Sequence, residues 1–224
     1  MPARMVPYRL PPVEASAAVA DAGAFADRLR QRRSCRHFDD RPVPQALIEQ
    51  LVRAAHAAPS GANRQPWRFV CVSDPAIKRE IRVAAEAEER ASYEHRMPPD
   101  WLEALEPIGT DWHKPFLEIA PWLVVLMRVD FELAADGRRL KTYYPAESCG
   151  IAAGLFLTAA HLAGLATLTH TPSPMRFLAD ILRRPDTERP FLLIPVGYPA
   201  VDAVVPDLPR KPLSDVIVWD RPAG

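Results

Sequence analysis

The sequence predicts one domain that mixes helices and strands. A chain of 224 residues can form one sizeable hydrophobic core and is short for two. Apolar residues recur at three- and four-residue spacing between Pro44 and Pro59, which indicates an amphipathic helix. β-Branched and aromatic residues are concentrated over 67–72, 121–129 and 190–198, which is typical of strands.

The N-terminal residues 1–20 contain several prolines and an acidic residue, so they lack the uninterrupted apolar core of a signal peptide. We expect an irregular arm there. A helix is expected over 21–33, with Ala22, Phe25 and Leu29 facing inward.

A long, charged helix is expected over 75–96 after a cap at Ser73-Asp74-Pro75. Pro98-Pro99 interrupts it before a short amphipathic piece over 101–105. A charged segment that prolines interrupt can act as a mobile cover, and we expect a lid over about 88–114.

The stretch Gly150 to Leu168 carries no formal charge and places Gly150 and Gly154 in G-x-x-x-G spacing. Two interpretations are open. It can be a membrane span, or Gly164 can divide it into a buried helix over 146–163 and a short strand over 165–169. The polar Thr158 and His161 favour the second interpretation.

The last residues, 200–224, are rich in prolines that keep a chain extended. We expect an arm that wraps another surface, with a strand-like end over 216–219. A short helix ending at Leu182 is expected before the last strand.

The composition excludes several classes of partner. The 28 basic and 28 acidic residues cancel, so no overall field draws the chain to nucleic acid or an anionic membrane. The three cysteines lack a C-x-x-C pair, which indicates neither a disulfide framework nor a zinc site and fits a reducing cytoplasm. The six histidines are scattered, and we expect no metal.

Arg32, Arg33, Ser34 and Arg36 bring three guanidinium groups and a hydroxyl into five residues, a set that suits one phosphate dianion. The cluster can also be the solvated basic end of a helix. A second cluster, Pro59 to Trp67, follows the next helix and can bring a hydroxyl and an amide to the same ligand.

Five motifs occur in an order that resembles the nitroreductase superfamily of FMN proteins, and within it the iodotyrosine deiodinase branch. The resemblance covers residues 25–219. The motifs are Arg32-Arg33-Ser34-Cys35-Arg36, Pro59-Ser60-Gly61-Ala62-Asn63, Thr169-His170-Thr171-Pro172, Pro195-Val196-Gly197-Tyr198-Pro199 and Pro206-Asp207-Leu208-Pro209-Arg210-Lys211-Pro212.

The resemblance implies an α+β fold, an α/β/α sandwich with a mixed central sheet, built as an intertwined homodimer with FMN at the subunit interface. It places the FMN-binding domain at 21–199 and makes 200–224 an arm over the partner. The G-x-x-x-G helix then becomes a dimer-core helix.

The same resemblance assigns cofactor-binding residues, which are Arg32, Arg33, Ser34, Arg36, Pro59, Ser60, Thr169, Thr171 and Arg210. Thr171 is the expected catalytic residue, because its hydroxyl would donate to flavin N5 and make single-electron steps accessible. Without the resemblance, capping of a strand end ahead of Pro172 is the simpler interpretation of both threonines.

The substrate residues that the resemblance implies are Ala62, Glu89, Tyr93 and Lys114. Glu89 and Tyr93 are four residues apart and share a helix face, so a carboxylate could receive an ammonium group while Lys114 receives a carboxylate. The Ala62 N–H would hold the phenolate. On local pattern alone, Glu89 belongs to a solvated, charged helix face.

These expectations combine into reductive dehalogenation of a halotyrosine by reduced FMN, with electrons from NAD(P)H or a reductase. Two alternatives are an NAD(P)H-dependent nitroreductase or quinone reductase of broad specificity, and a non-catalytic FMN-binding or membrane-associated protein. The lack of the N-terminal anchor seen in animal members leads us to expect a soluble, bacterial-type relative, and the cysteine usage leads us to expect a cytoplasmic location.

Overall fold

The computed structural model describes residues 3–220 and divides into two units between Arg32 and Arg33. In the first unit, an irregular segment leads into helix α1 (Ala15–Arg30). The helix begins before the expected start at Asp21, so the irregular arm predicted over 1–20 is too long. The reason is local: the prolines end at Pro12, and the alanine-rich residues that follow favour a helix.

The inward face expected on α1 is also wrong within the described chain. None of the α1 residues is buried, and Phe25 is exposed.

The second unit is built on a four-stranded sheet in the order β1 (Trp67–Val72), β2 (Trp122–Val129), β6 (Glu188–Gly197), β5 (Ala166–Thr167). All three ladders are antiparallel. A parallel bridge between Ser34 and Thr167 extends the β5 edge. The mixed character expected for the sheet is thus confined to this bridge, because β5 is too short to form a longer ladder.

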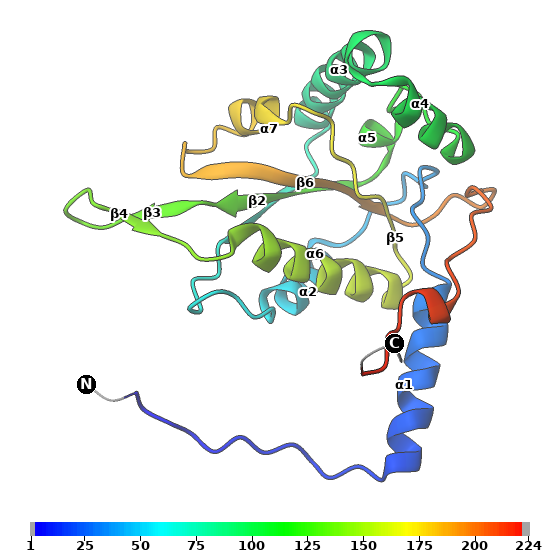
Figure 1. The fold of residues 1–224 in the computed structure, drawn as a ribbon. Coiled ribbons are helices and arrows are strands. Elements are labelled where there is room, and N and C mark those ends of the chain that lie inside the picture. The colour runs from blue at the N-terminus through cyan, green and yellow to red at the C-terminus, as the bar shows by residue number, and fades with distance from the viewer. Residues whose placement is uncertain (1–2, 221–224) are drawn as a thin grey trace. The chain divides into compact units, whose positions relative to one another are not determined.

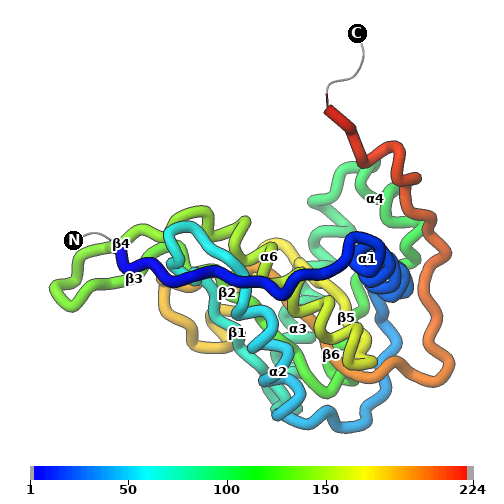
Figure 2. The backbone as a smooth tube through the Cα atoms, turned by 90° about the horizontal axis from the view of Figure 1, so that it is seen from below, coloured from blue at the N-terminus to red at the C-terminus, as the bar shows by residue number. Residues whose placement is uncertain are grey.

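Helices cover both faces of the sheet (Figure 1). On one face lie α2 (Gln45–His56) and α6 (Pro145–Leu162), which are side by side in Figure 2. On the other lie α3 (Pro75–Ala91), α5 (Phe116–Ile119) and α7 (Arg176–Ile181). The expected α/β/α sandwich is confirmed.

The core follows from this layering. Strand β2 runs through the middle, and Leu123 to Met127 are fully buried. A strand covered on both faces reads as a continuous apolar run rather than an alternating one. One hydrophobic cluster joins β2 to α3, α5 and α7, and a second joins it to α2 and α6.

The charged helix expected over 75–96 is divided. Asp74 caps α3 by accepting hydrogen bonds from the N–H groups of Ala76 (2.7 Å) and Ile77 (3.2 Å). The α-helix ends at Ala91 and continues as a π-helical turn, η1 (Ser92–Arg96). After the expected proline interruption come α4 (Pro99–Leu105) and a 3-10 turn, η2 (Glu106–Ile108).

Helix α6 is buried on one face only. Cys149, Ala152 and Phe156 lie in the core, whereas Ile151 and Leu155 are 47% and 37% exposed. The uncharged stretch is therefore a packing helix with one buried face and one exposed apolar face, followed by the expected short strand. Within residues 3–220, no helix has the length and hydropathy of a membrane span.

Two peripheral segments complete the chain. Strands β3 (Phe131–Leu133) and β4 (Arg139–Lys141) form a hairpin whose turn contains Asp136-Gly137. The C-terminal arm is irregular apart from a 3-10 turn, η3 (Leu213–Asp215). The strand-like end predicted at 216–219 is wrong for the described chain, because this segment pairs with no strand there. Residues 221–224 of the expected arm lie outside the described residues.

Candidate functional site

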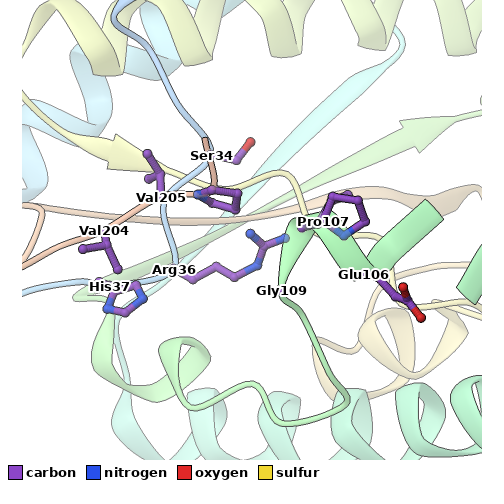
Figure 3. Close-up of a pocket in the computed structure, with 10 residues that line it drawn as sticks. Ser34, Arg36, His37, Glu106, Pro107, Gly109, Val204 and Val205 are labelled. Carbon is purple, nitrogen blue, oxygen red and sulfur yellow. The ribbon is translucent and has the colours of Figure 1, made fainter. Parts of the chain in front are cut away.

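A cavity of about 340 Å³ lies where three segments meet. Its walls are Ser34, Arg36 and His37 from the arginine cluster, Glu106 to Gly109 around η2, and Val204 to Pro206 from the C-terminal arm. Figure 3 shows the Arg36 side chain extending across the cavity toward Pro107.

The arginine cluster is held in place by backbone bonds. The Cys35 N–H donates to the Thr167 carbonyl at 3.0 Å, next to the Ser34–Thr167 bridge. The Arg33 guanidinium donates to the Pro206 carbonyl and so ties the cluster to the arm that carries Arg210. Arg32 ends the first unit of the structure.

Arg36 is half-buried, and burial lowers the pKa of its guanidinium from the ordinary value. None of the ion pairs within residues 3–220 includes Arg36. A partly desolvated cation beside the Ser34 hydroxyl forms a donor set that fits an anion such as a phosphate.

The second cluster forms the loop between α2 and β1. The Ser60 hydroxyl accepts a hydrogen bond from the Gln65 N–H at 2.9 Å. Gly61 forms a bridge with Tyr143, so closely that a Cβ atom on Gly61 would lie 2.5 Å from the Tyr143 oxygen. Ala62 and Asn63 have positive φ angles, 49° and 53°, which complete the tight turn.

This loop and the arginine cluster lie at opposite ends of α6. Gly61 contacts Tyr143, just before the helix, whereas Ser34 contacts Thr167, just after it. A helix of 18 residues is about 27 Å long at ~1.5 Å per residue. The structure of one chain therefore does not bring Pro59, Ser60 and Ala62 to the same ligand as Ser34 and Arg36.

The three residues expected to grip an amino-acid zwitterion do come together. Lys114 Nζ lies 3.4 Å from Glu89 Oε2, and the two side chains are only 4% and 12% exposed. Lys114 Nζ lies 5.8 Å from the centre of the Tyr93 ring. The solvated-face interpretation of Glu89 is therefore wrong, because the segment after η2 covers it.

The loop before α5 supplies the other contacts of this group. Lys114 Nζ also donates to Thr110 Oγ1 at 3.3 Å and to the Asp111 carbonyl. The Tyr93 hydroxyl donates to the Thr110 carbonyl at 3.1 Å. Burial lowers the pKa of Lys114, which Glu89 opposes, and burial raises the pKa of Tyr93.

Further contacts hold the segment over 88–114 against itself. Arg96 forms an ion pair with Glu88 at 2.7 Å across the π-helical turn. The Arg90 guanidinium lies 3.8 Å from the centre of the Trp112 ring. The segment expected to form a lid is thus folded and has its own internal contacts.

The two threonines lie on a segment whose burial alternates. Leu168, His170 and Pro172 are buried, while Thr169 and Thr171 are exposed. Alternate residues of an extended chain point to opposite sides, so both threonines face the same side. Hydrogen bonds between the backbones of His170 and Leu193, at 2.8 and 3.0 Å, fix this segment to β6.

Sequence reasoning missed several residues of this region. Val204 and Val205 line the cavity, and nothing in their local pattern distinguishes them from other arm residues. His170 had been counted as one scattered histidine. The alternation of apolar and polar residues around it was the signal that could have placed its side chain inside.

Comparison with known proteins agrees with this geometry. Residues 29–198 match the Nitroreductase family. The chain belongs to the nitroreductase family.

The relatives define its place more narrowly. An iodotyrosine deiodinase of Haliscomenobacter hydrossis is 53% identical over 213 residues, which cover 95% of this chain and 96% of the relative. Iodotyrosine deiodinase 1 of Homo sapiens is 41% identical over 197 residues, 87% of this chain and 68% of the relative. The expected resemblance to the iodotyrosine deiodinase branch is confirmed.

Solved structures show the same relationship. A crystal structure of oxidized iodotyrosine deiodinase bound to FMN and 3-iodo-L-tyrosine has 30% identity and a TM-score of 0.74, and the match covers 89% of this chain and 99% of that chain. A nitroreductase with bound FMN from Desulfitobacterium hafniense, at 23% identity and a TM-score of 0.63, shares the fold.

Proposed function

We propose that this protein is an FMN-dependent oxidoreductase that removes halide from halotyrosines. Reduced FMN supplies two electrons, one at a time, while the carbon–halogen bond of the ring breaks, halide leaves and a proton takes its place to give tyrosine. The observation that carries the proposal is the buried pair of Glu89 and Lys114 next to Tyr93. The iodotyrosine deiodinase relatives support it.

The pair is suited to a zwitterion. A protein is strongly destabilised when one charge of a buried ion pair is left without its partner. A ligand that carries both an ammonium group and a carboxylate can replace the two partners at once, with the ammonium group on Glu89 and the carboxylate on Lys114. A ligand that carries one charge leaves the other side chain unpaired, so the site selects amino acids.

Arg33, Ser34 and Arg36, together with Arg32 and Arg210, would hold the phosphate, ribityl and pyrimidine groups of FMN. The half-buried Arg36, which has no carboxylate partner within residues 3–220, supports this assignment. The contact of Arg33 with Pro206 brings the arm toward the cluster.

Thr169 and Thr171 would contact the ring system of the flavin. Both side chains are exposed on one side of a segment that β6 holds in place. In this arrangement the Thr171 hydroxyl can hold a proton next to flavin N5, which favours single-electron steps. Thr171 is the residue we assign to catalysis.

The complete site requires a homodimer. The loop with Pro59, Ser60 and Ala62 is separated from the arginine cluster by the length of α6. A two-fold axis that crosses α6 would bring the loop of one copy to the arginine cluster of the other. Gly150, Ile151, Gly154 and Leu155 are exposed along α6 and form a small, apolar surface for such packing.

The site would then combine residues of both copies. In this dimer the Ala62 N–H would reach the substrate phenolate, and the arm over 200–224 would pack on the neighbouring copy. The lid residues would close over the ring and exclude water. Light scattering of the purified protein tests this, because a monomer would leave the flavin site incomplete.

The electron donor and the compartment are further parts of the proposal. We assign NAD(P)H or a separate reductase as the donor and the cytoplasm as the compartment. The three cysteines are unpaired, and Cys35 and Cys149 are buried, which supports a reducing environment.

The decisive experiment mixes the FMN-reduced protein with 3-iodotyrosine under anaerobic conditions. Flavin reoxidation and iodide release are expected together. Lys114→Met should abolish both at low substrate concentration, whereas Arg79→Gln, an exposed residue of α3, should not. Absence of iodide from a fully flavin-loaded wild-type protein would contradict the proposal.

The broad-specificity nitroreductase gives a different outcome in the same set of variants. It would reduce nitroaromatics with NAD(P)H at a rate that Glu89→Gln and Lys114→Met leave unchanged, since those ligands carry no amino-acid group.

A further inference from the structure

His170 is a buried polar residue for which the proposed chemistry has no role. It lies between Thr169 and Thr171, and its residue is 8% exposed. Its Nε2 atom has no hydrogen-bond partner in the described chain. A buried polar atom without a partner destabilises the folded state, so a hydrogen-bond donor is expected to reach Nε2 in the complete site.

The surroundings of the imidazole define what Nε2 can do. Phe116 packs edge-on against the ring, with centroids 5.8 Å apart and an angle of 87° between the planes. The charged groups that act on the ring are Lys114 and Arg36. Both are donors without acceptor capacity. Nε2 is therefore placed as an acceptor.

Burial and these two cations lower the pKa of His170 to about 3. The imidazole stays neutral at physiological pH, and one ring nitrogen keeps a free lone pair. A protonated His170 ring would add a third positive charge next to those of Lys114 and Arg36.

His170 is connected to both halves of the site. Phe116, against which its ring packs, is two residues after Lys114. The His170 backbone is hydrogen-bonded to that of Leu193. These two bonds hold the extended segment on which Thr171 is the next residue. The residue thus joins the substrate grip to the flavin side.

The three N–H groups of Lys114 have acceptors in the ligand-free structure, namely Glu89, Thr110 and Asp111. A ligand that pairs its ammonium group with Glu89 and its carboxylate with Lys114 reorients the Lys114 ammonium group, so that one N–H can turn from Thr110 or Asp111 to another acceptor. This inference rests on the proposed function. We propose that His170 is a positioning residue, whose Nε2 accepts a hydrogen bond from the Lys114 ammonium group when an amino-acid ligand binds.

The first test is a binding titration of flavin-loaded variants in which quenching of flavin fluorescence measures ligand binding. His170→Leu should weaken 3-iodotyrosine binding about tenfold or more, the size expected for a hydrogen bond to a charged group. His170→Gln keeps a neutral acceptor and should stay within about threefold of wild type. Binding of 2-iodophenol, which lacks the amino-acid group, should be unchanged in both.

A role limited to packing would give equal losses in the two variants, or the same loss for 2-iodophenol, and either result would overturn the inference. So would unchanged binding of 3-iodotyrosine by His170→Leu. Failure of the wild-type protein to bind 3-iodotyrosine would instead reject the proposed function.

The second test needs no variant that might unfold. Nitrogen NMR of the histidine-labelled wild-type protein should show the Nε2 resonance of His170 shifting with 3-iodotyrosine and not with 2-iodophenol.

The third test is a double-mutant cycle. In this cycle, His170→Leu should add little loss of 3-iodotyrosine binding to that of Lys114→Met. A stationary resonance, or additive losses in the cycle, would rule out the bond.

Discussion

Lys114 Nζ and Glu89 Oε2 lie 3.4 Å apart, and they join the two ends of the segment over 88–114. The two side chains come from α3 and from the loop before α5, and neither is solvated enough to be stable alone. In the proposed zwitterion site, their pairing compensates both buried charges when no ligand is bound.

Removal of either charge should weaken both folding and ligand binding, because the remaining buried charge is left uncompensated. Glu89→Gln or Lys114→Met is expected to weaken 3-iodotyrosine binding by about 10- to 100-fold, since hydrogen bonds to charged groups contribute ~1.5–3 kcal/mol. The dissociation constant from flavin-fluorescence quenching measures the effect.

Arg79 provides the matched control. It is 69% exposed and lies 3.8 Å from Glu118, so Arg79→Gln removes a charge of the same helix without touching the buried pair. Equal losses in Arg79→Gln and Lys114→Met would mean that net charge, not the pair, controls binding.

Arg36 should be required for flavin retention. Arg36→Ala removes a partly buried cation from the cavity and is expected to yield a folded protein that purifies colourless. The ratio of absorbance at the flavin band to that at 280 nm measures occupancy. Arg53→Ala, on the exposed side of α2, should stay yellow. A yellow Arg36→Ala protein at full occupancy would remove Arg36 from the cofactor site.

Much of the fold was predictable because its signals are local. The strand Trp67–Val72 has the predicted bounds, and Asp74 caps α3 as predicted. The Asp136-Gly137 turn likewise depends on the preferences of adjacent residues. The early start of α1 is harder to predict, because the prolines up to Pro12 disfavour a helix whereas the alanines that follow favour one.

The site was less accessible to local reasoning. A charged run containing Glu89 has the same composition whether water or a neighbouring loop covers it, so the resemblance, not the pattern, predicted its contact with Lys114. The π-helical turn that carries Tyr93 and the contact of Gly61 with Tyr143 depend on residues far along the chain. No periodicity encodes them.

Thr171 should affect turnover rather than binding. Thr171→Ala removes the hydroxyl assigned to flavin N5 and is expected to slow iodide release about tenfold or more at saturating 3-iodotyrosine, a loss of at least ~1.4 kcal/mol. Thr171→Ser restores the hydroxyl and should recover most of the rate. Stopped-flow reoxidation of the reduced flavin measures both, and a Thr171→Ser rate as low as that of Thr171→Ala would argue against a role for the hydroxyl.

Gly61 should be intolerant of any side chain. A Cβ atom at Gly61 would lie 2.5 Å from the backbone carbonyl oxygen of Tyr143 and 2.8 Å from the Tyr143 Cβ atom. Gly61→Ala must therefore shift the loop that carries Ser60. Overpacking of this kind costs about 1–3 kcal/mol. Urea unfolding should report the loss, and flavin affinity should fall with it.

Gly23 gives the comparison for that experiment. Nothing lies within 4 Å of a Cβ atom at this α1 position. Gly23→Ala is expected to be neutral or to stabilise the helix by about 0.5–1 kcal/mol. If both variants lose stability equally, the clash with Tyr143 is not the cause.

His170 should make the folded state sensitive to acid. Burial and the cations Lys114 and Arg36 lower its folded-state pKa to about 3, below the ordinary value of 6.5. Between these values the unfolded chain binds the extra proton, so stability is fully present above pH 6.5 and is lost as the pH falls toward 3, by at most ~1.4 kcal/mol per pH unit. His170→Gln cannot titrate, and its free energy of unfolding should fall less steeply over this window. Denaturant unfolding at several pH values compares the two slopes; parallel slopes would show that the His170 imidazole is solvated or paired in the folded protein.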